Sequence, residues 1–276
     1  MPVASAIRAA TDRELPLVVE ILRRAGFGTQ VARLLEYPRR SPHGAILVAE
    51  GDGGEICGVA CCAAFDGTGW IGALGVAPDA RRRGMGSALT DGAVRWLRGR
   101  GARTVLLYAT EAGRPIYERH GFVAEQRATA WRGAAGAAPP VPLRRLAERD
   151  RAALRTIDAE ATGEDRAAVL EAIHPLAGVA ADDRDGALAG WAVSSPWGLG
   201  TAITARTPEA GVALMAAATS GPRGGTLIVP DPNPAARDAL AAWRFVRLND
   251  ALRMRLGPAV AWRPEQQFGL FNLFWG

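Results

Sequence analysis

A glycine-rich segment, PDARRRGMGSALTDGAVRWL at residues 78–97, places three arginines and two glycines where a helix is expected to begin. Each glycine in a helix costs roughly 1 kcal/mol relative to alanine, so the pattern calls for a compensating role. The first N–H groups of a helix lack internal partners and carry the positive end of its dipole, and glycine lets an anion approach them closely. The segment therefore predicts a site for a di-anionic group over residues 82–87.

Two common phosphate-binding loops are excluded by the spacing. The chain contains no lysine, so G-x-x-x-x-G-K-[ST] is absent, and the segment itself is not G-x-G-x-x-G, because its spacing is G-x-G preceded by R-x-x. A glycine pair before a helix is also typical of a loop that needs positive φ angles. The assignment therefore depends on a second motif elsewhere in the chain.

That second motif makes the chain resemble a known family. LGVAPDARRRGMGSALTDGAVRWL is similar to the acetyl-CoA-binding segment of the GCN5-related N-acetyltransferase superfamily, which has Q/R-x-x-G-x-G/A after a strand ending in V-x-P. GRPIYERHGF, at residues 113–122, looks like the tyrosine of that family followed by x-x-x-G-F. The resemblance covers most of residues 6–130.

The resemblance implies a set of site residues. The backbone of residues 74–76 would hydrogen-bond the pantetheine arm of acetyl-CoA, and that of residues 82–87 would hold its pyrophosphate, with arginine charge nearby. Tyr117 would lie near the sulfur and act as the catalytic residue, while two further positions fall where the family has an asparagine and a small residue beside the cofactor. The expected cofactor-binding residues are Leu74, Gly75, Val76, Arg81, Arg82, Arg83, Gly84, Met85, Gly86, Ser87, Thr110 and Gly113.

The implied activity is that of an N-acetyltransferase, an enzyme that moves an acetyl group from acetyl-CoA, its co-substrate, to a primary amine by direct attack. Tyr117, with an ordinary pKa near 10, is suited to protonate the departing thiolate as a general acid. The alternative is a non-catalytic acyl-CoA-binding regulatory module. Gly72 favours this alternative because many relatives carry an acidic residue there, whereas the retention of Tyr117 argues against it.

The general base is left open by the sequence. Glu50, Asp66, Glu111 and His43 are candidates by expected proximity, and each is also compatible with an ordinary surface role. A chain of water molecules is a further route for the proton. No base is assigned.

Histidine and cysteine spacing predicts no metal site. His120 lies beside a glycine at an expected helix end, where a partly charged imidazole suits the dipole, and His174 precedes a proline. Cys57, Cys61 and Cys62 fall in one apolar stretch, which indicates buried thiols rather than a disulfide framework or a zinc site.

The elements that must position these residues follow from apolar periodicity and turn signals. Thr11-x-x-Glu14 is a capping-box signature before a helix, and a further helix is expected from Ser87 to Arg98. The order β-α-β-β-β-α-β-α-β up to residue 131 predicts a mixed α/β fold. Residues 132–143 are small and proline-rich, and we expect a linker there.

The second half of the chain echoes the first. GGTLIVPDPNPAARDALAAWRFVRLNDALRMRLG aligns with the segment that begins at Gly101, so that Phe122 pairs with Phe245 and Leu240 stands in place of Tyr117. The expected fold is two tandem α/β (α+β) domains of the acetyltransferase type, each a mixed, mostly antiparallel sheet flanked by helices. Residues 1–138 would bind acetyl-CoA and catalyse, and residues 139–276 would be a degenerate domain that walls the acceptor cleft or is structural.

Composition limits the remaining classes. The 276 residues are 49% hydrophobic and contain no apolar run of membrane-spanning length, so a soluble cytoplasmic protein with no membrane partner is expected. All 33 basic residues are arginines, spread among 28 acidic residues, which indicates a mild preference for anionic ligands and no nucleic-acid partner. A small-molecule or peptide amine acceptor and a monomer or homodimer are expected.

Overall fold

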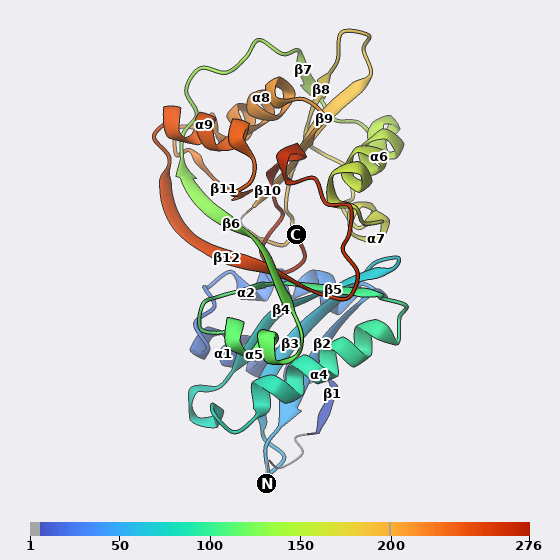
Figure 1. Cartoon of the computed structure of the whole chain (residues 1–276), viewed down its shortest axis with the longest axis vertical. Helices are drawn as coiled ribbons and strands as arrows, with labels where there is room; N and C mark the ends of the chain where they lie inside the picture. The colour runs from blue at the N-terminus through green and yellow to red at the C-terminus, as the bar shows by residue number, and fades with distance from the viewer. Residues whose placement is uncertain (1–5, 199) are drawn as a thin grey trace. The chain divides into compact units, whose positions relative to one another are not determined.

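The computed structural model describes residues 6–198 and 200–276, and it divides into two compact units (Figure 1). Unit 1 comprises Met1–Ala124, Met254–Pro258 and Trp275. Unit 2 comprises Glu125–Arg253, Ala259–Phe274 and Gly276. The architecture is mixed α/β in both units, as the sequence predicts.

Unit 1 follows the predicted order of elements, with two additional short helices, α2 and α3, before the second strand. Its elements are β1 (Ile7–Ala9), α1 (Leu15–Arg24), α2 (Val31–Leu34), α3 (Glu36–Arg40), β2 (Gly44–Glu50), β3 (Ile56–Ala64), β4 (Thr68–Val76), α4 (Met85–Arg98), β5 (Thr104–Ala109), α5 (Arg114–Arg119) and the start of β6 (Val123–Gly133). Its strands are ordered β1-β2-β3-β4-β5, followed by the end of β12 (Val246–Leu256). Neighbours from β1 to β4 are antiparallel and β4–β5 is parallel, which confirms the mostly antiparallel sheet.

Helices cover both faces of β4. A Cβ added to Gly69 would lie 2.6 Å from Leu97 of α4, and one added to Gly75 would lie 3.0 Å from Leu22 of α1. These two glycines would share a face of an ideal strand, but β4 carries one extra residue between them, so they face opposite helices. Leu22 and Leu97 are fully buried, which places the core of unit 1 on both sides of this strand.

The end of the chain completes unit 1. The side-chain hydroxyl of Thr104, at the start of β5, donates to the carbonyl of Pro258 at 2.8 Å. The ring of Trp275 packs 5.3 Å from that of Tyr37. Residues from the last tenth of the sequence are therefore part of the same compact unit as the glycine-rich loop.

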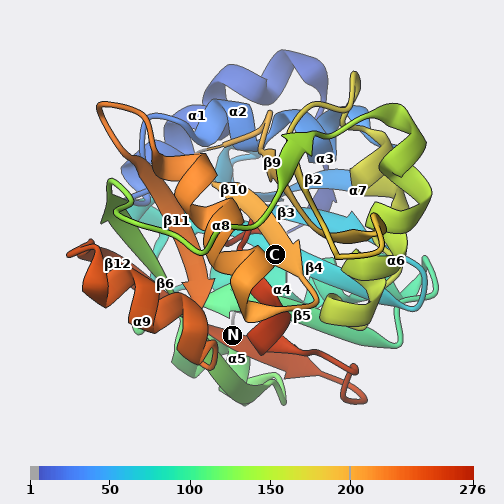
Figure 2. The same ribbon diagram turned by 90° about the horizontal axis from the view of Figure 1, so that it is seen from above.

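Unit 2 contains two groups of strands, ordered β12-β6-β11 and β13-β10-β9-β8-β7. Figure 2 shows α8 lying over β10 and β9, and the residues of these elements share one buried cluster. The elements of unit 2 not yet given are β7 (Leu143–Arg145), α6 (Arg151–Thr162), α7 (Ala167–Glu171), β8 (Val179–Asp182), β9 (Leu188–Ser194), β10 (Thr201–Ala205), α8 (Pro208–Thr219), β11 (Gly225–Pro230), α9 (Pro234–Ala242) and β13 (Gln267–Gly269).

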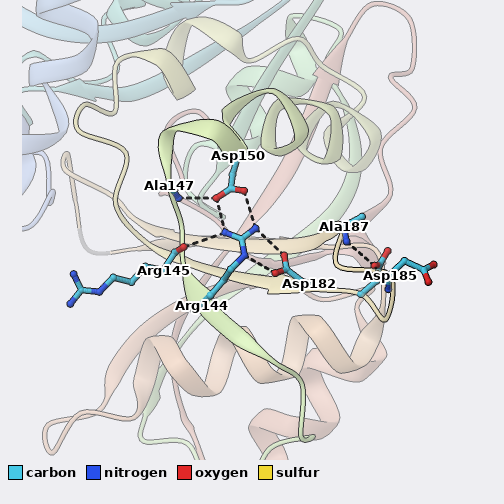
Figure 3. A network of polar contacts seen from close by, with 8 residues as sticks. Arg144, Arg145, Ala147, Asp150, Asp182, Asp185 and Ala187 are labelled. Atoms are coloured by element: carbon cyan, nitrogen blue, oxygen red, sulfur yellow. Dashed lines mark hydrogen bonds and ion pairs between the residues drawn. The ribbon is translucent and has the colours of Figure 1, made fainter.

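An arginine clamp in unit 2 ties the first strand to the first helix and the second strand. Arg144 of β7 donates to both oxygens of Asp150 at 2.8 and 2.9 Å and to both oxygens of Asp182, at the end of β8, at 2.6 and 3.0 Å (Figure 3). Asp150 also accepts from the backbone N–H of Ala147 at 2.8 Å, which caps the turn that leads into α6. One guanidinium thus satisfies two carboxylates with paired hydrogen bonds.

Unit 1 contains the same clamp at the corresponding place. Arg8 of β1 donates to both oxygens of Glu14 at 2.6 and 3.0 Å and to Glu50, at the end of β2, at 2.7 Å. Glu14 accepts from the backbone N–H of Thr11 at 2.7 Å, as the predicted capping box requires. The arginine and its capping acid are six residues apart in both units, which supports the internal duplication inferred from the sequence.

The corners after α5 and α9 are also equivalent. Phe122 N–H donates to Tyr117 O at 3.0 Å, and Phe245 N–H donates to Leu240 O at 2.9 Å. The residue before each phenylalanine has a positive φ, +82° at Gly121 and +58° at Arg244. The predicted correspondence of Tyr117 with Leu240 therefore agrees with the backbone geometry of the two units.

Within the described residues, no helix has the length and apolar character needed to cross a membrane.

Candidate active site

The glycine-rich loop leads directly into α4, which begins at Met85, two residues earlier than predicted. Gly84 is the N-cap, with a left-handed φ of +84°. The first helical hydrogen bond runs from Ala88 N–H to Gly84 O at 2.9 Å, so the N–H groups of residues 85–87 precede the helical ladder. Backbone donors at the positive end of a 14-residue helix are suited to an anion.

The three arginines of the loop have different surroundings. Arg81 donates through Nε to Val76 O at 3.2 Å and through Nη2 to Ala25 O at 3.4 Å, so its guanidinium joins the loop to the end of β4 and to α1. Arg82 and Arg83 are exposed, and Arg82 has a positive φ of +63°. The backbone of the loop therefore bends sharply just before the helix, with two cationic side chains in solvent.

The strand before the loop carries a bulge that separates it from β5. Gly72 lies opposite Cys61 and Gly75 lies opposite Val59, so Ala73 and Leu74 together face one residue of β3. Ala73 has a φ of +46°, a strained value for a residue with a Cβ. The parallel pairing of β4 with β5 is recorded from Thr68 to Ile71 and ends there, whereas β4 continues to Val76. The bulge thus releases the end of β4 from β5.

The released end of β4 directs backbone donors away from β3. Ala77 N–H donates to Cys57 O at 2.8 Å, and successive residues of an antiparallel strand alternate between its two neighbours. Gly75 therefore faces β3, while Leu74 and Val76 face the side from which β5 has separated. The Val76 carbonyl accepts from Arg81 there, which agrees with this orientation.

Tyr117 lies on α5 with its side chain buried, at 8% exposure. Its ring packs edge-on against Phe122 with centroids 5.8 Å apart, and a Cβ added to Gly113 would lie 3.4 Å from Tyr117 Cε2. Burial raises the pKa of the Tyr117 hydroxyl above its ordinary value. The hydroxyl therefore stays protonated at neutral pH, as a proton donor must.

Thr110 and Gly113 form the turn that starts α5. Gly113 N–H donates to Thr110 Oγ1 at 3.2 Å, and Arg114 N–H donates to Thr110 O at 3.0 Å. The side chain of Thr110 thus organises the helix that carries Tyr117. The predicted position of Thr110 beside the cofactor stays a prediction.

Of the four candidate general bases, Glu50 is held in an ion pair. Glu50 is engaged by Arg8 in the clamp of unit 1. Asp66, Glu111 and His43 are exposed, and Gly72 has no side chain to offer. No base is assigned from this arrangement.

A side-chain relay that sequence reasoning missed lies beside the loop. Ser87 Oγ is 2.7 Å from His120 Nε2, and His120 Nδ1 is 2.9 Å from Asp91 Oδ1. The sequence predicts that His120 lies at the end of a helix, and His120 does follow α5 directly. The signal that could have found the relay is the spacing of Ser87 and Asp91, four residues apart on one face of α4.

The three cysteines are free and buried, as predicted. Burial raises the pKa of the Cys61 and Cys62 thiols, which makes them poor nucleophiles and metal ligands. Among the described residues, no group of three or more histidine, cysteine, aspartate or glutamate side chains is arranged to hold a metal ion.

The corresponding place in unit 2 is filled by the chain itself. By the order of elements β10 corresponds to β4 and β11 to β5, and β13 pairs with β10 from Gln267 to Gly269. Leu270 N–H, just after β13, donates to Ile228 O of β11 at 2.8 Å. The side-chain amide of Asn233 holds the segment by donating to the carbonyls of Glu265 and Gln267 at 3.1 and 2.9 Å.

The helix that corresponds to α4 has a side-chain cap, which α4 lacks. Thr207 caps α8, and its side-chain oxygen accepts from Ala210 N–H at 3.3 Å. A Cβ added to Gly211 would lie 2.2 Å from the ring of Phe268, so the neighbouring turn of α8 packs directly on β13. The strand edge and the helix start of unit 2 that correspond to the end of β4 and the start of α4 are thus engaged by protein atoms.

Comparison with known proteins agrees with this pair of units. The model described as "Acetyltransferase (GNAT) family" matches residues 16–122, and the model described as "Acetyltransferase (GNAT) domain" matches residues 154–269. A mycothiol acetyltransferase from Geodermatophilus obscurus is 42% identical over 72 residues, which covers 25% of this chain and 23% of that relative's length.

Solved structures share the whole fold. A putative acetyltransferase from Pyrococcus horikoshii is similar with a TM-score of 0.80 and 22% identity, covering 99% of this chain and 96% of that one. A GCN5-related N-acetyltransferase from Sphaerobacter thermophilus has a TM-score of 0.61 and 13% identity, over 95% and 99% of the two chains. The chain belongs to the GNAT acetyltransferases and carries two such domains in tandem.

Proposed function

We propose that the chain transfers an acetyl group from acetyl-CoA to a primary amine at one site in unit 1. The observation that carries this proposal is the difference between the units. Unit 1 combines a bulged strand that separates from its neighbour with a start of α4 that no side chain caps, whereas the equivalent features of unit 2 are engaged by β13 and Thr207. Because both units belong to the same family, the difference between them points to one unit that binds acetyl-CoA and one that does not.

The residues of unit 1 have distinct roles in the proposed reaction. The N–H groups of Leu74 and Val76 would hold the pantetheine arm and polarise the thioester carbonyl, and those of residues 82–87 would hold the pyrophosphate. Gly84 would keep a side chain out of the approach to this backbone, and Gly86 leaves room for Ile116 of α5, since a Cβ on Gly86 would lie 3.0 Å from its Cδ1. Tyr117 would donate its proton to the departing thiolate while the neutral amine forms the new bond.

Thiol release in the presence of acetyl-CoA and a panel of amines tests the proposal. The panel should include amino acids, polyamines, aminoglycosides, peptide N-termini and protein lysines, with Tyr117→Phe as the matched control. Release of thiol that depends on one amine class supports acetyl transfer. Tight acetyl-CoA binding without release for any amine favours the non-catalytic regulatory module instead.

A further inference from the structure

The relay of Ser87, His120 and Asp91 joins two helices at the start of α4. Ser87 and Asp91 lie on α4, and His120 follows α5. The His120 side chain is 15% exposed, while that of Asp91 is 59% exposed and in contact with water. The imidazole is therefore held at both nitrogens, by a hydroxyl that belongs to the anion-binding turn and by a carboxylate on its far side.

Hydrogen-bond polarity fixes which groups donate in the relay. A carboxylate only accepts, so His120 Nδ1 carries a proton and donates to Asp91. In a neutral imidazole Nε2 then has no proton and accepts from the hydroxyl of Ser87. With the imidazole neutral, the hydrogen of Ser87 is directed at His120, and Ser87 Oγ presents only lone pairs to anything that approaches the start of α4.

An anion at residues 82–87 requires the opposite polarity. Lone pairs on Ser87 Oγ repel a phosphate oxygen, whereas a hydroxyl proton directed at it contributes a charge-assisted hydrogen bond. A second proton on the imidazole reverses the relay, because Nε2 then donates to Oγ and frees the Ser87 hydroxyl to donate to the anion. The imidazolium also adds one positive charge close to the site.

We propose that Ser87, His120 and Asp91 form a proton-coupled clamp for the cofactor pyrophosphate, in which acetyl-CoA binding takes up one proton from solvent onto His120. This inference rests on the proposed function because it takes the pyrophosphate to lie over residues 82–87. His120 is a positioning residue in this account, since it acts through Ser87 and not on the reacting atoms. The proton enters from water on binding and returns to water on release.

Other charged groups near His120 are satisfied or lie in solvent. Arg114 and Glu118 of α5 pair with each other at 2.6 Å. Arg255, from the strand end that packs on Gly121, donates to the carbonyl of Gly257. The remaining charged groups on the elements around the imidazole are Arg82 and Arg83 of the loop, Arg95 of α4 and Arg119 of α5, in addition to Asp91.

Unit 2 provides an internal comparison. The offset that relates Tyr117 to Leu240 and Phe122 to Phe245 places Ala210 at the position of Ser87, Leu214 at that of Asp91 and Trp243 at that of His120. Ala210 and Leu214 are apolar residues, and both are buried. All three members of the relay are thus absent from the unit whose helix start is capped by its own threonine, as expected if the relay serves an anion and not the fold.

Calorimetric titration with acetyl-CoA tests the clamp. Titrations in buffers of different ionisation enthalpy report the number of protons taken up, and they should be made on wild type, His120→Gln, Ser87→Ala and the control His174→Gln. His174 is exposed and on a loop of unit 2, so the control removes a histidine outside the relay. Uptake by the phosphates of acetyl-CoA itself is common to all four proteins and cancels in the comparison.

We expect wild type and His174→Gln to take up more protons than His120→Gln and Ser87→Ala. The affinity of wild type should fall as pH rises, by at most about tenfold per unit for one proton, while the affinity of His120→Gln should change less. In turnover the same variant should raise the KM for acetyl-CoA more than it lowers kcat, which loss of structure would not produce.

Two outcomes would overturn these ideas separately. Acetyl-CoA binding with equal proton uptake in wild type and His120→Gln would refute the clamp and leave the proposed function intact. A folded wild type that binds no acetyl-CoA would refute the proposed function and the clamp together.

Discussion

Replacement of Tyr117 by phenylalanine removes one oxygen atom from a buried ring. The ring keeps its edge-on contact with Phe122, 5.8 Å between centroids, and its packing against Gly113. Loss of a single hydroxyl that leaves ring packing in place changes the free energy of unfolding by about 1 kcal/mol or less. The variant should therefore fold and bind acetyl-CoA as wild type does.

The effect on turnover should be much larger than the effect on stability. A positioned general acid contributes roughly 10²–10⁴-fold to a rate, which corresponds to about 2.7–5.4 kcal/mol in the activation free energy. We expect kcat for the best amine to fall within this range in Tyr117→Phe. The dissociation constant for acetyl-CoA should stay within about twofold of wild type, because the backbone donors of the loop are untouched.

The pH dependence follows from the burial of the same hydroxyl. Burial raises the pKa of Tyr117, so the unfolded chain loses this proton first, near its ordinary value of about 10. The native state then binds more protons than the unfolded state, and stability falls as pH rises above about 10, by at most about 1.4 kcal/mol per unit. Tyr117→Phe should lack this contribution, whereas below about pH 10 the two proteins should show parallel stability.

Three measurements together decide the role of Tyr117. Thiol release gives kcat, calorimetry gives the affinity for acetyl-CoA, and chemical denaturation at neutral and alkaline pH gives the free energy of unfolding. An unchanged kcat in a variant with unchanged affinity would refute the general-acid role.

Further predictions concern stability. Arg166→Ala leaves Asp158 as a buried, unpaired charge, since the two side chains are 2% and 1% exposed and 2.7 Å apart; the free energy of unfolding should fall by about 3–5 kcal/mol in chemical denaturation. Arg8 lowers the pKa of Glu14 to about 2 from 4.5, so the stabilisation is present above about pH 4.5 and is lost as pH falls towards 2; Arg8→Met should shift acid unfolding, followed by circular dichroism, to higher pH. Trp275→Ala should cost about 3–5 kcal/mol and weaken unit 1, because this buried residue packs in the unit that holds the glycine-rich loop; unaltered thermal unfolding would contradict its place there.

Local patterns predicted the elements of unit 1 well. The capping box at Thr11, the turn between β2 and β3, and the glycine pair at the start of α4 each act over a few residues, and each is found within two residues of its expected place. The resemblance to the family singled out Tyr117 and the loop as candidate site residues. The similarity between the two halves of the sequence aligned Leu240 with Tyr117. These features depend on local chemistry, which a sequence displays directly.

Features that depend on distant parts of the chain were not predicted. The β4 bulge requires Ala73 to adopt a positive φ, which its residue type does not indicate. The placement of β13 against β10, and of Trp275 in unit 1, joins segments far apart in sequence. The pairing of His120 with Ser87 needs the packing of α5 on α4, and so only the spacing on α4 was visible beforehand.

We propose that this chain of two acetyltransferase units has one acetyl-CoA site, in unit 1. Calorimetric titration of the full chain with acetyl-CoA decides the number of sites, because it reports stoichiometry independently of the amine acceptor. We predict one molecule bound per chain. A stoichiometry of two would contradict the occupation of the unit 2 site by β13, and no binding by the folded protein would contradict the site in unit 1.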